Sequence, residues 1–478
     1  MSLTSPLFLA FLAAVVVAFH VSESVAYRRL VLGTANAIFI ASYLTDFTQV
    51  LPLLAFLVLG YVCVSTVYFR KSAPLLALCV IAILCSYVFL KRFSFIEGLG
   101  QLPFPYLTIG LSYILFRILH LMVDVRSGDL VERIGPLAFF RFACNFLYFV
   151  SGPIQRYQDF CAADGKATVQ LDSSRVYQAF SRIATGYVKF VVVAASAEYA
   201  FTFLNPKLQA TGLAFPTLCV IYATVATLYT IYLYFNFSGY MDIVIGVGTL
   251  LGQSLPENFD KPFSARSFLE FWQRWHMTLS QWFKFYLFNP LLMFLMTCFP
   301  APALTAYLGV LAFFVTFLVM GVWHGTTAVF IIYGLLMGAG ASINKLWQLA
   351  CTERLGKKRY RALSEQTAYI YFARGLTVAY FVLALTCLWA TELPQFTQLV
   401  MQLGLTGILG TYVLLVGVFA VAALMLDFIM ARVPSPPSLS AIRGGEIVRN
   451  LALASKMMAI FAVATLLHKA PDFVYKAF

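Results

Sequence analysis

Residues 304–343 read LTAYLGVLAFFVTFLVMGVWHGTTAVFIIYGLLMGAGASI, a run that contains no charged side chain. As a single helix this run would be roughly 60 Å long, about twice the thickness of the hydrocarbon core of a bilayer. It must therefore turn, and GVWHG at 321–325 places two glycines at its midpoint. The stretch predicts two membrane-spanning helices that meet at a turn containing His324.

The rest of the chain has the same apolar character. Of its 478 residues, 61% are hydrophobic and 11% are charged, against roughly a quarter charged in soluble domains. The apolar runs are too long and continuous for the alternating strands of a membrane barrel. We therefore expect an all-α polytopic membrane protein, a single domain over residues 1–478, with about 11–13 transmembrane helices plus re-entrant or interfacial helices. The run 212–252 is also too long for one crossing, and FSGY (237–240) is the expected break.

Basic residues give the chain a net charge of +13 and gather in short loops. The loop ERLGKKRYR (353–361) and the segment from Arg432 to Arg449 are separated by two apolar runs, 367–391 and 405–430. Two crossings place both basic segments on one face, which the positive-inside rule makes cytoplasmic. An acidic protein, a phosphate-bearing cofactor and anionic lipid headgroups would all suit this face. No nucleic-acid partner is expected.

The segment FWQRWHMTLSQWF (271–283) concentrates tryptophans and ionisable residues in an apolar chain. On a helical wheel drawn over 270–288, the aromatic and polar residues separate onto two faces, which predicts one amphipathic helix. The aromatic face collects Phe271, Trp272, Trp275, Leu279, Trp282, Phe283 and Tyr286. The polar face collects Glu270, Gln273, Arg274, Thr278, Ser280, Gln281 and Lys284. His276 falls at the seam, where its ring would either reach water or serve a function.

Two ionisable residues lie deep within apolar runs, and such residues are functional candidates by default. His324 follows Trp323, and the alternative for it is an incidental histidine in a surface turn. Asp242 lies near Tyr240 in FNFSGYMDIVIGVG, and its alternative role is a structural hydrogen bond. The nine cysteines are scattered, without histidines at metal-ligand spacing, so no metal site is expected.

Four segments together resemble the membrane-bound O-acyltransferase (MBOAT) family. They are SGPIQRYQDF (151–160), FNFSGYMDIVIGVGTLLG (235–252), PENFDKPFSARSFLEFWQRWHMTLSQWF (256–283) and MGVWHGTTAVFIIYGLLMG (320–338). The similarity runs from about 150 to 345, with residues 1–149 and 346–478 matching only in hydropathy. The chain looks most like the bacterial branch that contains the D-alanyl transfer protein of teichoic-acid D-alanylation and the alginate O-acetyltransferase.

The resemblance implies a ring of helices around a thinned centre in the bacterial cytoplasmic (inner) membrane. A cytoplasmic thioester would enter from one side and a hydroxyl acceptor from the other. His324 would act as general base or acyl-positioning group, and His276 would be the second family histidine, nearer the donor. The candidates to line the donor or substrate site are Trp323, Arg274, Trp275, Ser280, Asp242, Tyr240 and Asn258.

The resemblance also sets expectations for donor and partners. No tightly bound cofactor is expected, because the acyl group would arrive on an acyl carrier protein or on acetyl-CoA. The partner would be a small membrane protein or a periplasmic transferase that relays the acyl group. The 48-residue interval between the two histidines favours D-alanyl transfer. The alternatives are acetyl transfer to an exopolysaccharide and a non-enzymatic conduit for lipid or polymer.

Overall fold

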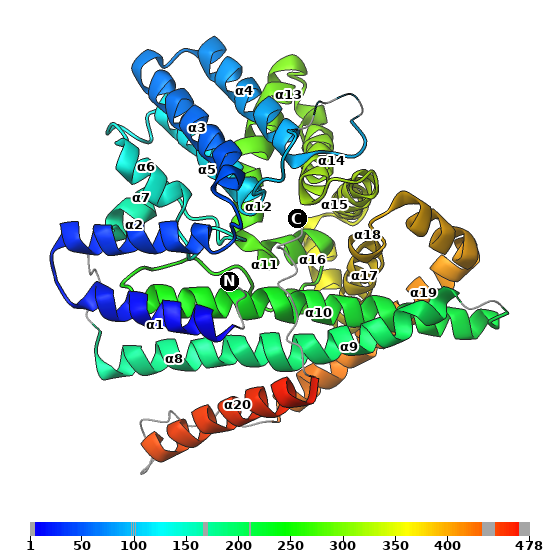
Figure 1. The fold of residues 1–478 in the computed structure, drawn as a ribbon. Helices are drawn as coiled ribbons and strands as arrows, with labels where there is room; N and C mark the ends of the chain where they lie inside the picture. Colours follow the sequence, from blue (N-terminus) through cyan, green and yellow to red (C-terminus); the bar gives the residue numbers. More distant parts are fainter. Residues whose placement is uncertain are drawn as a thin grey trace. The chain divides into compact units, whose positions relative to one another are not determined.

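A computed structural model describes residues 5–96, 98, 100, 102–165, 171–209, 212–432 and 445–467. Over these residues the regular elements are helices, with one isolated antiparallel bridge between Phe259 and Trp275 (Figure 1). Within this described part, nine helices are long and apolar enough to cross a membrane. The predicted all-α polytopic fold is confirmed. The nine candidates are fewer than the 11–13 crossings expected, and three of the apolar runs, near residues 5–22, 30–45 and 103–123, form helices of only 15 to 17 residues.

The chain divides into two compact units. The first comprises the described residues of Met1–Tyr187 and Gly239–Glu257. Its helices are α1 (Pro6–His20), α2 (Val25–Ala41), α3 (Leu51–Arg70), α4 (Ala73–Lys91), α5 (Leu111–Ser127), α6 (Pro136–Ala143), α7 (Tyr157–Ala163) and α8 (Ser173–Tyr187), together with the end of α10 (Phe215–Leu250).

The second unit comprises the described residues of Val188–Ser238 and Asn258–Pro471. It starts with a π-helix, η2 (Val188–Ala194), and contains most of α10. Its other helices are α9 (Ala195–Leu204), α11 (Phe268–Arg274), α12 (Met277–Phe283), the π-helix η5 (Lys284–Phe288), α13 (Asn289–Cys298), α14 (Thr305–His324), α15 (Val329–Leu355), α16 (Lys357–Ser364), α17 (Thr367–Ala384), α18 (Thr386–Trp389), α19 (Leu393–Met430) and α20 (Gly445–Leu467).

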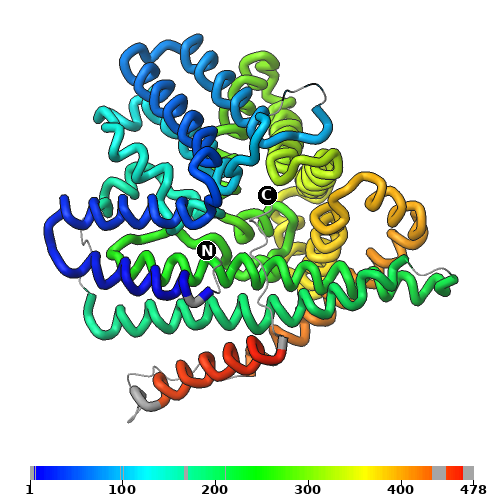
Figure 2. Tube along the Cα trace, in the orientation of Figure 1, coloured from blue at the N-terminus to red at the C-terminus, as the bar shows by residue number. Residues whose placement is uncertain are grey.

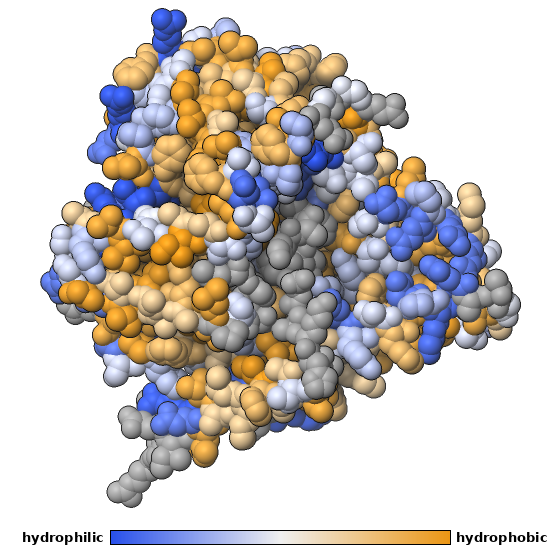
Figure 3. All heavy atoms as spheres, viewed as in Figure 1, coloured by the Kyte–Doolittle hydropathy of each residue, from blue (hydrophilic) through white to orange (hydrophobic). Residues whose placement is uncertain are grey.

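Local sequence signals explain where several helices begin. Proline occupies the first turn of α1, α3, α4 and α6, where its missing N–H leaves no helical hydrogen bond unmade. Ser5 caps α1 by accepting the N–H of Phe8 at 3.2 Å. Many exposed side chains of α3, α4 and α19 are large and apolar, and such residues cover much of the visible face in Figure 3. This is the surface expected of helices that face lipid.

Buried charges of the first unit are satisfied within it. Asp164 accepts hydrogen bonds from Arg141 at 2.7 Å and pairs with Arg29 at 3.0 Å. The guanidinium of Arg117, which is 1% exposed, donates to two backbone carbonyls. Paired in this way, these charges avoid the large cost of leaving a charge unpaired in an apolar interior.

The predicted turn at GVWHG is confirmed. Helix α14 ends at His324 and α15 begins at Val329, and the two helices pack side by side (Figures 1 and 2). A Cβ placed on Gly321 would lie 2.1 Å from the Cα of Gly334, so the two backbones touch at this point. Small residues allow such close approach between helices in a membrane.

The expected break at FSGY is wrong. Helix α10 runs without interruption from Phe215 to Leu250, and its path through this sequence can be followed in Figure 2. The glycine of this sequence serves packing instead. A Cβ on Gly186 of α8 would lie 2.6 Å from the carbonyl oxygen of Gly239. The part of α10 that exceeds the length of one membrane crossing is therefore also helical.

The basic segments differ in what the structure describes. Residues 353–361 form the end of α15 and the start of α16, a short helix without buried residues. Most of the segment from Arg432 to Arg449 lies outside the described residues. The helices between them, α17 and α19, pack against each other, and Arg374 of α17 pairs with Asp427 of α19 at 2.6 Å. The cytoplasmic assignment of both segments stays a prediction.

Candidate active site

His324 is the last residue of α14 and is 3% exposed. The next residue, Gly325, is extended, and a Cβ there would lie 2.1 Å from the ring of Phe330. The absence of a side chain at Gly325 therefore lets the Phe330 ring pack directly against the turn that follows the histidine. The His324 ring makes edge contacts with Trp323 and Tyr333, with centroids 4.9 and 5.5 Å apart. The histidine is thus held rigidly at the tip of a tightly packed helical hairpin.

A backbone hydrogen bond fixes which nitrogen of His324 is basic. Nδ1 lies 2.6 Å from the carbonyl oxygen of Met320, one turn earlier in α14. A carbonyl can only accept, so Nδ1 carries the hydrogen in the neutral ring, and Nε2 bears the lone pair. This is the arrangement of a general base, in which a partner on one nitrogen orients the ring and the other nitrogen takes the proton.

His276 lies between α11 and α12, in the left-handed conformation with φ 44° and ψ 52°. A residue other than glycine pays a steric cost there, and such strain is found most often at functional sites. Neighbouring backbone pairing holds the strained residue. Phe259 forms a bridge with Trp275, and the N–H of Met277 donates to the carbonyl of Asn258 at 2.9 Å.

The single amphipathic helix expected over residues 270–288 is therefore wrong. The segment breaks at His276 because the preceding loop pairs with Trp275 and Met277, which removes these residues from helical hydrogen bonding. The aromatic face was predicted correctly, since Trp272, Trp275 and Trp282 are all buried. His276 is 1% exposed, so its ring does not reach water.

The amide of Asn258 organises the loop around His276. Its Oδ1 accepts the backbone N–H of Thr278 at 3.0 Å and the hydroxyl of Thr278 at 2.8 Å. Nδ1 of His276 lies 3.3 Å from the same oxygen, which places the hydrogen on Nδ1. Asn258 is fully buried. Both histidines therefore present Nε2 as the basic nitrogen of the neutral ring.

Aromatic rings fix the position of this loop. Trp275 stacks on Phe271 at 5.5 Å and meets the edge of Phe381 at 4.9 Å. Phe237 of α10 contacts the His276 ring edge-on at 4.8 Å. Edge and offset contacts of this kind add to the stabilisation that burial provides. Tryptophan and phenylalanine thus hold the histidine loop against α10 and α17.

The two histidines interact electrostatically. Burial holds the pKa of His276 well below its ordinary value, and a proton on His324 lowers that pKa further. The neutral imidazole is therefore the form present near neutral pH. A neutral ring can accept a proton, which a histidinium cannot.

The other predicted residues of this unit have defined partners. Arg274 pairs with Glu270 at 2.9 Å and with Asp260 at 3.5 Å, so its guanidinium ties α11 to the loop after Asn258. The hydroxyl of Ser280 donates to the carbonyl of Trp275 at 3.4 Å. These contacts give both residues a role in shaping the loop, and their role toward a donor stays a prediction.

Tyr240 and Asp242 belong to the first unit. Tyr240 is 2% exposed, and its hydroxyl donates to the carbonyls of Leu147 at 3.2 Å and Gly152 at 3.4 Å. Asp242 pairs with Arg182 at 3.1 Å. The structural hydrogen bond that was the alternative for Asp242 is therefore present. Of the predicted residues, His276, His324, Trp275, Trp323 and Asn258 form the candidate site in the second unit.

Sequence reasoning missed two kinds of supporting residue. Phe237 and Phe381 enclose the histidine loop, yet they come from helices that the local pattern does not connect with it. Thr278 was assigned to a polar face and is buried against Asn258. The aromatic pair in FNF, directly before the deep polar residues of α10, was the available signal for Phe237.

Replacing Asn258 by alanine is expected to destabilise the protein by about 1–3 kcal/mol, because it leaves the buried N–H of Thr278 without an acceptor. It should also lower turnover more than it weakens donor binding, because His276 loses the group that orients it. Thermal unfolding in detergent measures the loss of stability, and separate kcat and KM values distinguish slower turnover from weaker donor binding. The matched control is Gln273→Ala on the exposed side of α11, which should leave the stability and the turnover unchanged.

Stability is expected to fall as the pH drops through the ordinary histidine pKa of roughly 6.5. The unfolded chain then binds a proton that buried His276 does not, so protons favour unfolding below that pH. The melting temperature should therefore be lower at about pH 5.5 than at about pH 7.5. The difference in melting temperature between the two pH values should be smaller in His276→Gln. An equal fall in melting temperature in the unmodified protein and the variant would show that His276 does not contribute to the pH dependence of stability.

The structure thus defines a class: a polytopic helical membrane protein whose second unit carries two buried histidines, one at a hairpin tip and one in a strained loop. The chain belongs to the MBOAT, membrane-bound O-acyltransferase family, whose sequence model matches residues 125–386, more than half of its length. The match includes both histidines and the hairpin that carries His324.

Curated relatives fall into two groups. The teichoic acid D-alanyltransferase of Streptococcus thermophilus is 35% identical over 266 residues, which cover 53% of this chain and 60% of the relative. That of Bacillus subtilis is 34% identical over 229 residues, covering 48% and 56%. The probable alginate O-acetylase AlgI of Azotobacter vinelandii is 29% identical over 340 residues, covering 67% and 64%. The chain matches about three fifths of the length of these relatives.

Proposed function

We propose that the protein is an O-acyltransferase of a bacterial cytoplasmic membrane. It moves an acyl group from a cytoplasmic thioester to an extracytoplasmic hydroxyl of a cell-envelope polymer or of a relay partner. The observation that carries the proposal is the geometry of His324, buried at a hairpin tip with Nδ1 held by Met320. Family membership supports the acyl-transfer chemistry.

The proposed step needs one base and no cofactor. Nε2 of His324 takes the proton of the acceptor hydroxyl while the oxygen attacks the thioester carbonyl carbon. The C–S bond breaks, an ester forms, and the leaving thiolate receives the proton back from His324. General base catalysis contributes about 10²- to 10⁴-fold to such a reaction. His276, neutral and fixed by Asn258, orients the donor beside the reacting carbonyl.

We favour the D-alanyl group as the acyl group. The identity of 34–35% to two teichoic acid D-alanyltransferases and the 48-residue interval between the histidines support this assignment. The donor is then an acyl carrier protein charged with D-alanine. Such carriers are acidic, and the basic, exposed helix α16 suits an acidic partner. A small membrane protein would relay the acyl group.

Acetyl transfer is the second candidate. The alginate O-acetylases are 29–31% identical to this chain, against 29–35% for the teichoic acid D-alanyltransferases, and the similarity covers 67% of the chain for the relative from Azotobacter vinelandii. In this case acetyl-CoA is the donor, its phosphates meeting the basic residues of α16, and a periplasmic transferase receives the group.

One experiment separates the two donors. Purified protein is incubated with radiolabelled acetyl-CoA and, in parallel, with carrier protein charged with radiolabelled D-alanine. We expect label to move from the carrier protein and to remain on acetyl-CoA. Transfer from acetyl-CoA alone would replace the D-alanyl assignment with acetylation. Transfer from neither, in the presence of acceptor and partner, would contradict acyl transfer itself.

A further inference from the structure

A cavity of about 860 Å³ lies in the second unit, and neither His276 nor His324 is among the residues that line it. It is enclosed by α10, α15, α17 and α19, and aliphatic and aromatic side chains make up most of its lining. Typical lining residues are Leu336, Ile343, Leu376, Leu383, Leu403 and Leu409. The volume is in the range of roughly 300–1,000 Å³ that is usual for sites holding a small ligand.

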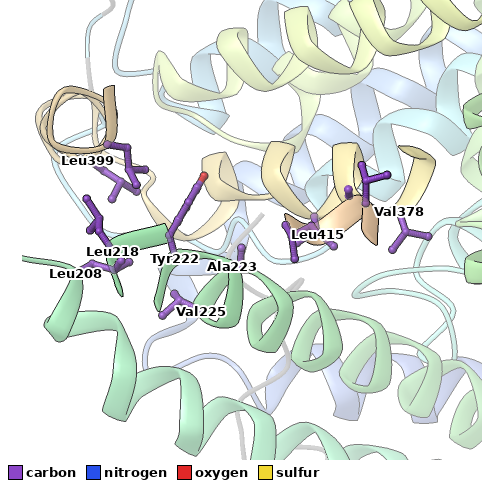
Figure 4. Packing of buried hydrophobic residues seen from close by; sticks show 13 residues of the cluster. Leu208, Leu218, Tyr222, Ala223, Val225, Val378, Leu399 and Leu415 are labelled. Atoms are coloured by element: carbon purple, nitrogen blue, oxygen red, sulfur yellow. The ribbon is translucent and has the colours of Figure 1, made fainter. Parts of the chain in front are cut away.

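Part of the lining of this cavity belongs to a packed apolar cluster. Figure 4 shows side chains of this cluster on α10, α17 and α19, among them Tyr222, Val378 and Leu399. Tyr222 and Leu399 also line the cavity. Side chains this well packed give the cavity a fixed wall, so it is a built feature of the helices around it.

The three tyrosine hydroxyls of the lining are bonded to the protein itself. Tyr222 shares a hydrogen bond with Thr386 at 2.8 Å. The hydroxyl of Tyr380 donates to a carbonyl of α15 at 2.5 Å, and that of Tyr412 donates to a carbonyl of α17 at 3.3 Å. Because these hydroxyls already have hydrogen-bond partners in the protein, they do not need a polar ligand. The chemistry of the cavity therefore suits a hydrocarbon chain.

The cavity is elongated along the helices. Its lining extends on α15 from Ile332 to Trp347, which corresponds to about 22 Å of helix. One leaflet of a bilayer contributes roughly half of the 30 Å hydrocarbon thickness, so a lipid tail lying along α15 would fit this length. Exposed lining residues such as Ile343 (63%) and Leu409 (52%) place the opening on the outer surface of the helices.

One end of the cavity is next to a concentration of positive charge. At this end Trp347 donates from Nε1 to the hydroxyl of Tyr369 at 3.1 Å, and such residues are typical of the membrane interface. Residues 345–365 carry six basic and two acidic side chains. Basic segments beside an opening between membrane helices bind anionic lipid headgroups.

We propose that this cavity binds one acyl chain of an anionic glycerophospholipid from the surrounding bilayer. The chain lies along α15 between α17 and α19, and the phosphate lies at the Trp347 end beside α16. The bound lipid covers the outer side of Phe268, the first residue of α11, and so supports the helix that leads to His276. This binding does not depend on which acyl group the protein transfers.

The test uses the full chain in lipid nanodiscs that contain phosphatidylglycerol with a diazirine in one acyl chain. After irradiation, labelled peptides are mapped by mass spectrometry. Leu336→Trp and Leu409→Trp fill the cavity from two different helices. Each has a neighbour on the same helix that is exposed and outside the lining, Leu335→Trp and Leu405→Trp. We expect label at lining residues of α15 and α17, reduced at least fivefold by the filling variants and unchanged by the controls.

Label confined to outward-facing residues would overturn the proposal, as would equal labelling of filled and control variants. Filling at Leu409 keeps the test valid if Leu336→Trp does not fold, because Leu409 lies half exposed at the rim.

Competition by unlabelled lipid tests which headgroup the site prefers. Phosphatidylglycerol should displace the probe better than phosphatidylcholine, and the triple variant Lys357→Gln, Lys358→Gln, Arg359→Gln should lose this preference. Equal displacement of the probe by the two lipids in the unmodified protein would contradict the proposed preference for an anionic headgroup.

Discussion

Replacing His324 by alanine is expected to slow acyl transfer by about 10²- to 10⁴-fold, the usual contribution of a general base. The side chain lies at the C-terminal end of α14, so its removal leaves the α14–α15 contacts at Gly321 and Gly334 unchanged. The protein should therefore still fold. Transfer of labelled acyl group per minute, measured at saturating donor, gives the effect.

A second substitution separates proton transfer from hydrogen bonding. In His324→Asn the amide nitrogen can occupy the position of Nδ1 and still donate to the carbonyl of Met320, but the amide cannot act as a base, so this variant should be about as slow as His324→Ala. His20 serves as the matched control, because its ring also bonds a backbone carbonyl, that of Leu250 at 2.8 Å. His20→Gln should retain the normal rate. Normal turnover by folded His324→Ala would remove His324 from the chemistry.

Replacing Gly321 by alanine is expected to cause a large loss of stability. The new Cβ would lie 2.1 Å from the Cα of Gly334, and backbone cannot give way as a flexible side chain does. Forcing the helices apart costs about 1–3 kcal/mol or more, as for other overpacked cores. It would also displace His324, one turn further along α14, so activity should fall with stability. The melting temperature in detergent and the transfer rate measure both effects.

Gly309 provides the control on the same helix. A Cβ there would meet nothing within 4 Å, so Gly309→Ala removes backbone freedom without creating a clash. It should be neutral, or stabilising by roughly 0.5–1 kcal/mol. Equal melting temperatures for the two alanine variants would show that the close approach at Gly321 is not needed.

The helical hairpin was predictable from the sequence because its causes are local. An uncharged run twice the length of a crossing must turn, and glycine marks the place, as the positions of Gly321 and Gly325 confirm. The burial of Trp272 and Trp275 was also predictable, since helical spacing decides which side chains share a face. Gly239 shows the limit, because a glycine that lets two helices touch looks the same in sequence as one that ends a helix.

The geometry of the second histidine was not predictable from local pattern. The helix breaks at His276 because residues before Pro262 pair with its neighbours Trp275 and Met277, and this pairing joins segments that a helical wheel cannot relate. The role of Asp242 depended likewise on Arg182, sixty positions earlier in the chain. The residues of the candidate site were proposed from their kinds and order in the sequence, whereas their hydrogen bonds depend on tertiary contacts.

The most direct test of acyl transfer across the membrane uses proteoliposomes. Charged donor is supplied on the side of the basic loop 353–361, and the hydroxyl acceptor, with its partner, is enclosed on the other side. We predict that labelled acyl ester accumulates on the enclosed acceptor and that His324→Ala abolishes this accumulation. The contrary result would be movement of lipid or polymer without any donor, unaffected by loss of either histidine and without labelled ester, which would identify a conduit instead of an acyltransferase.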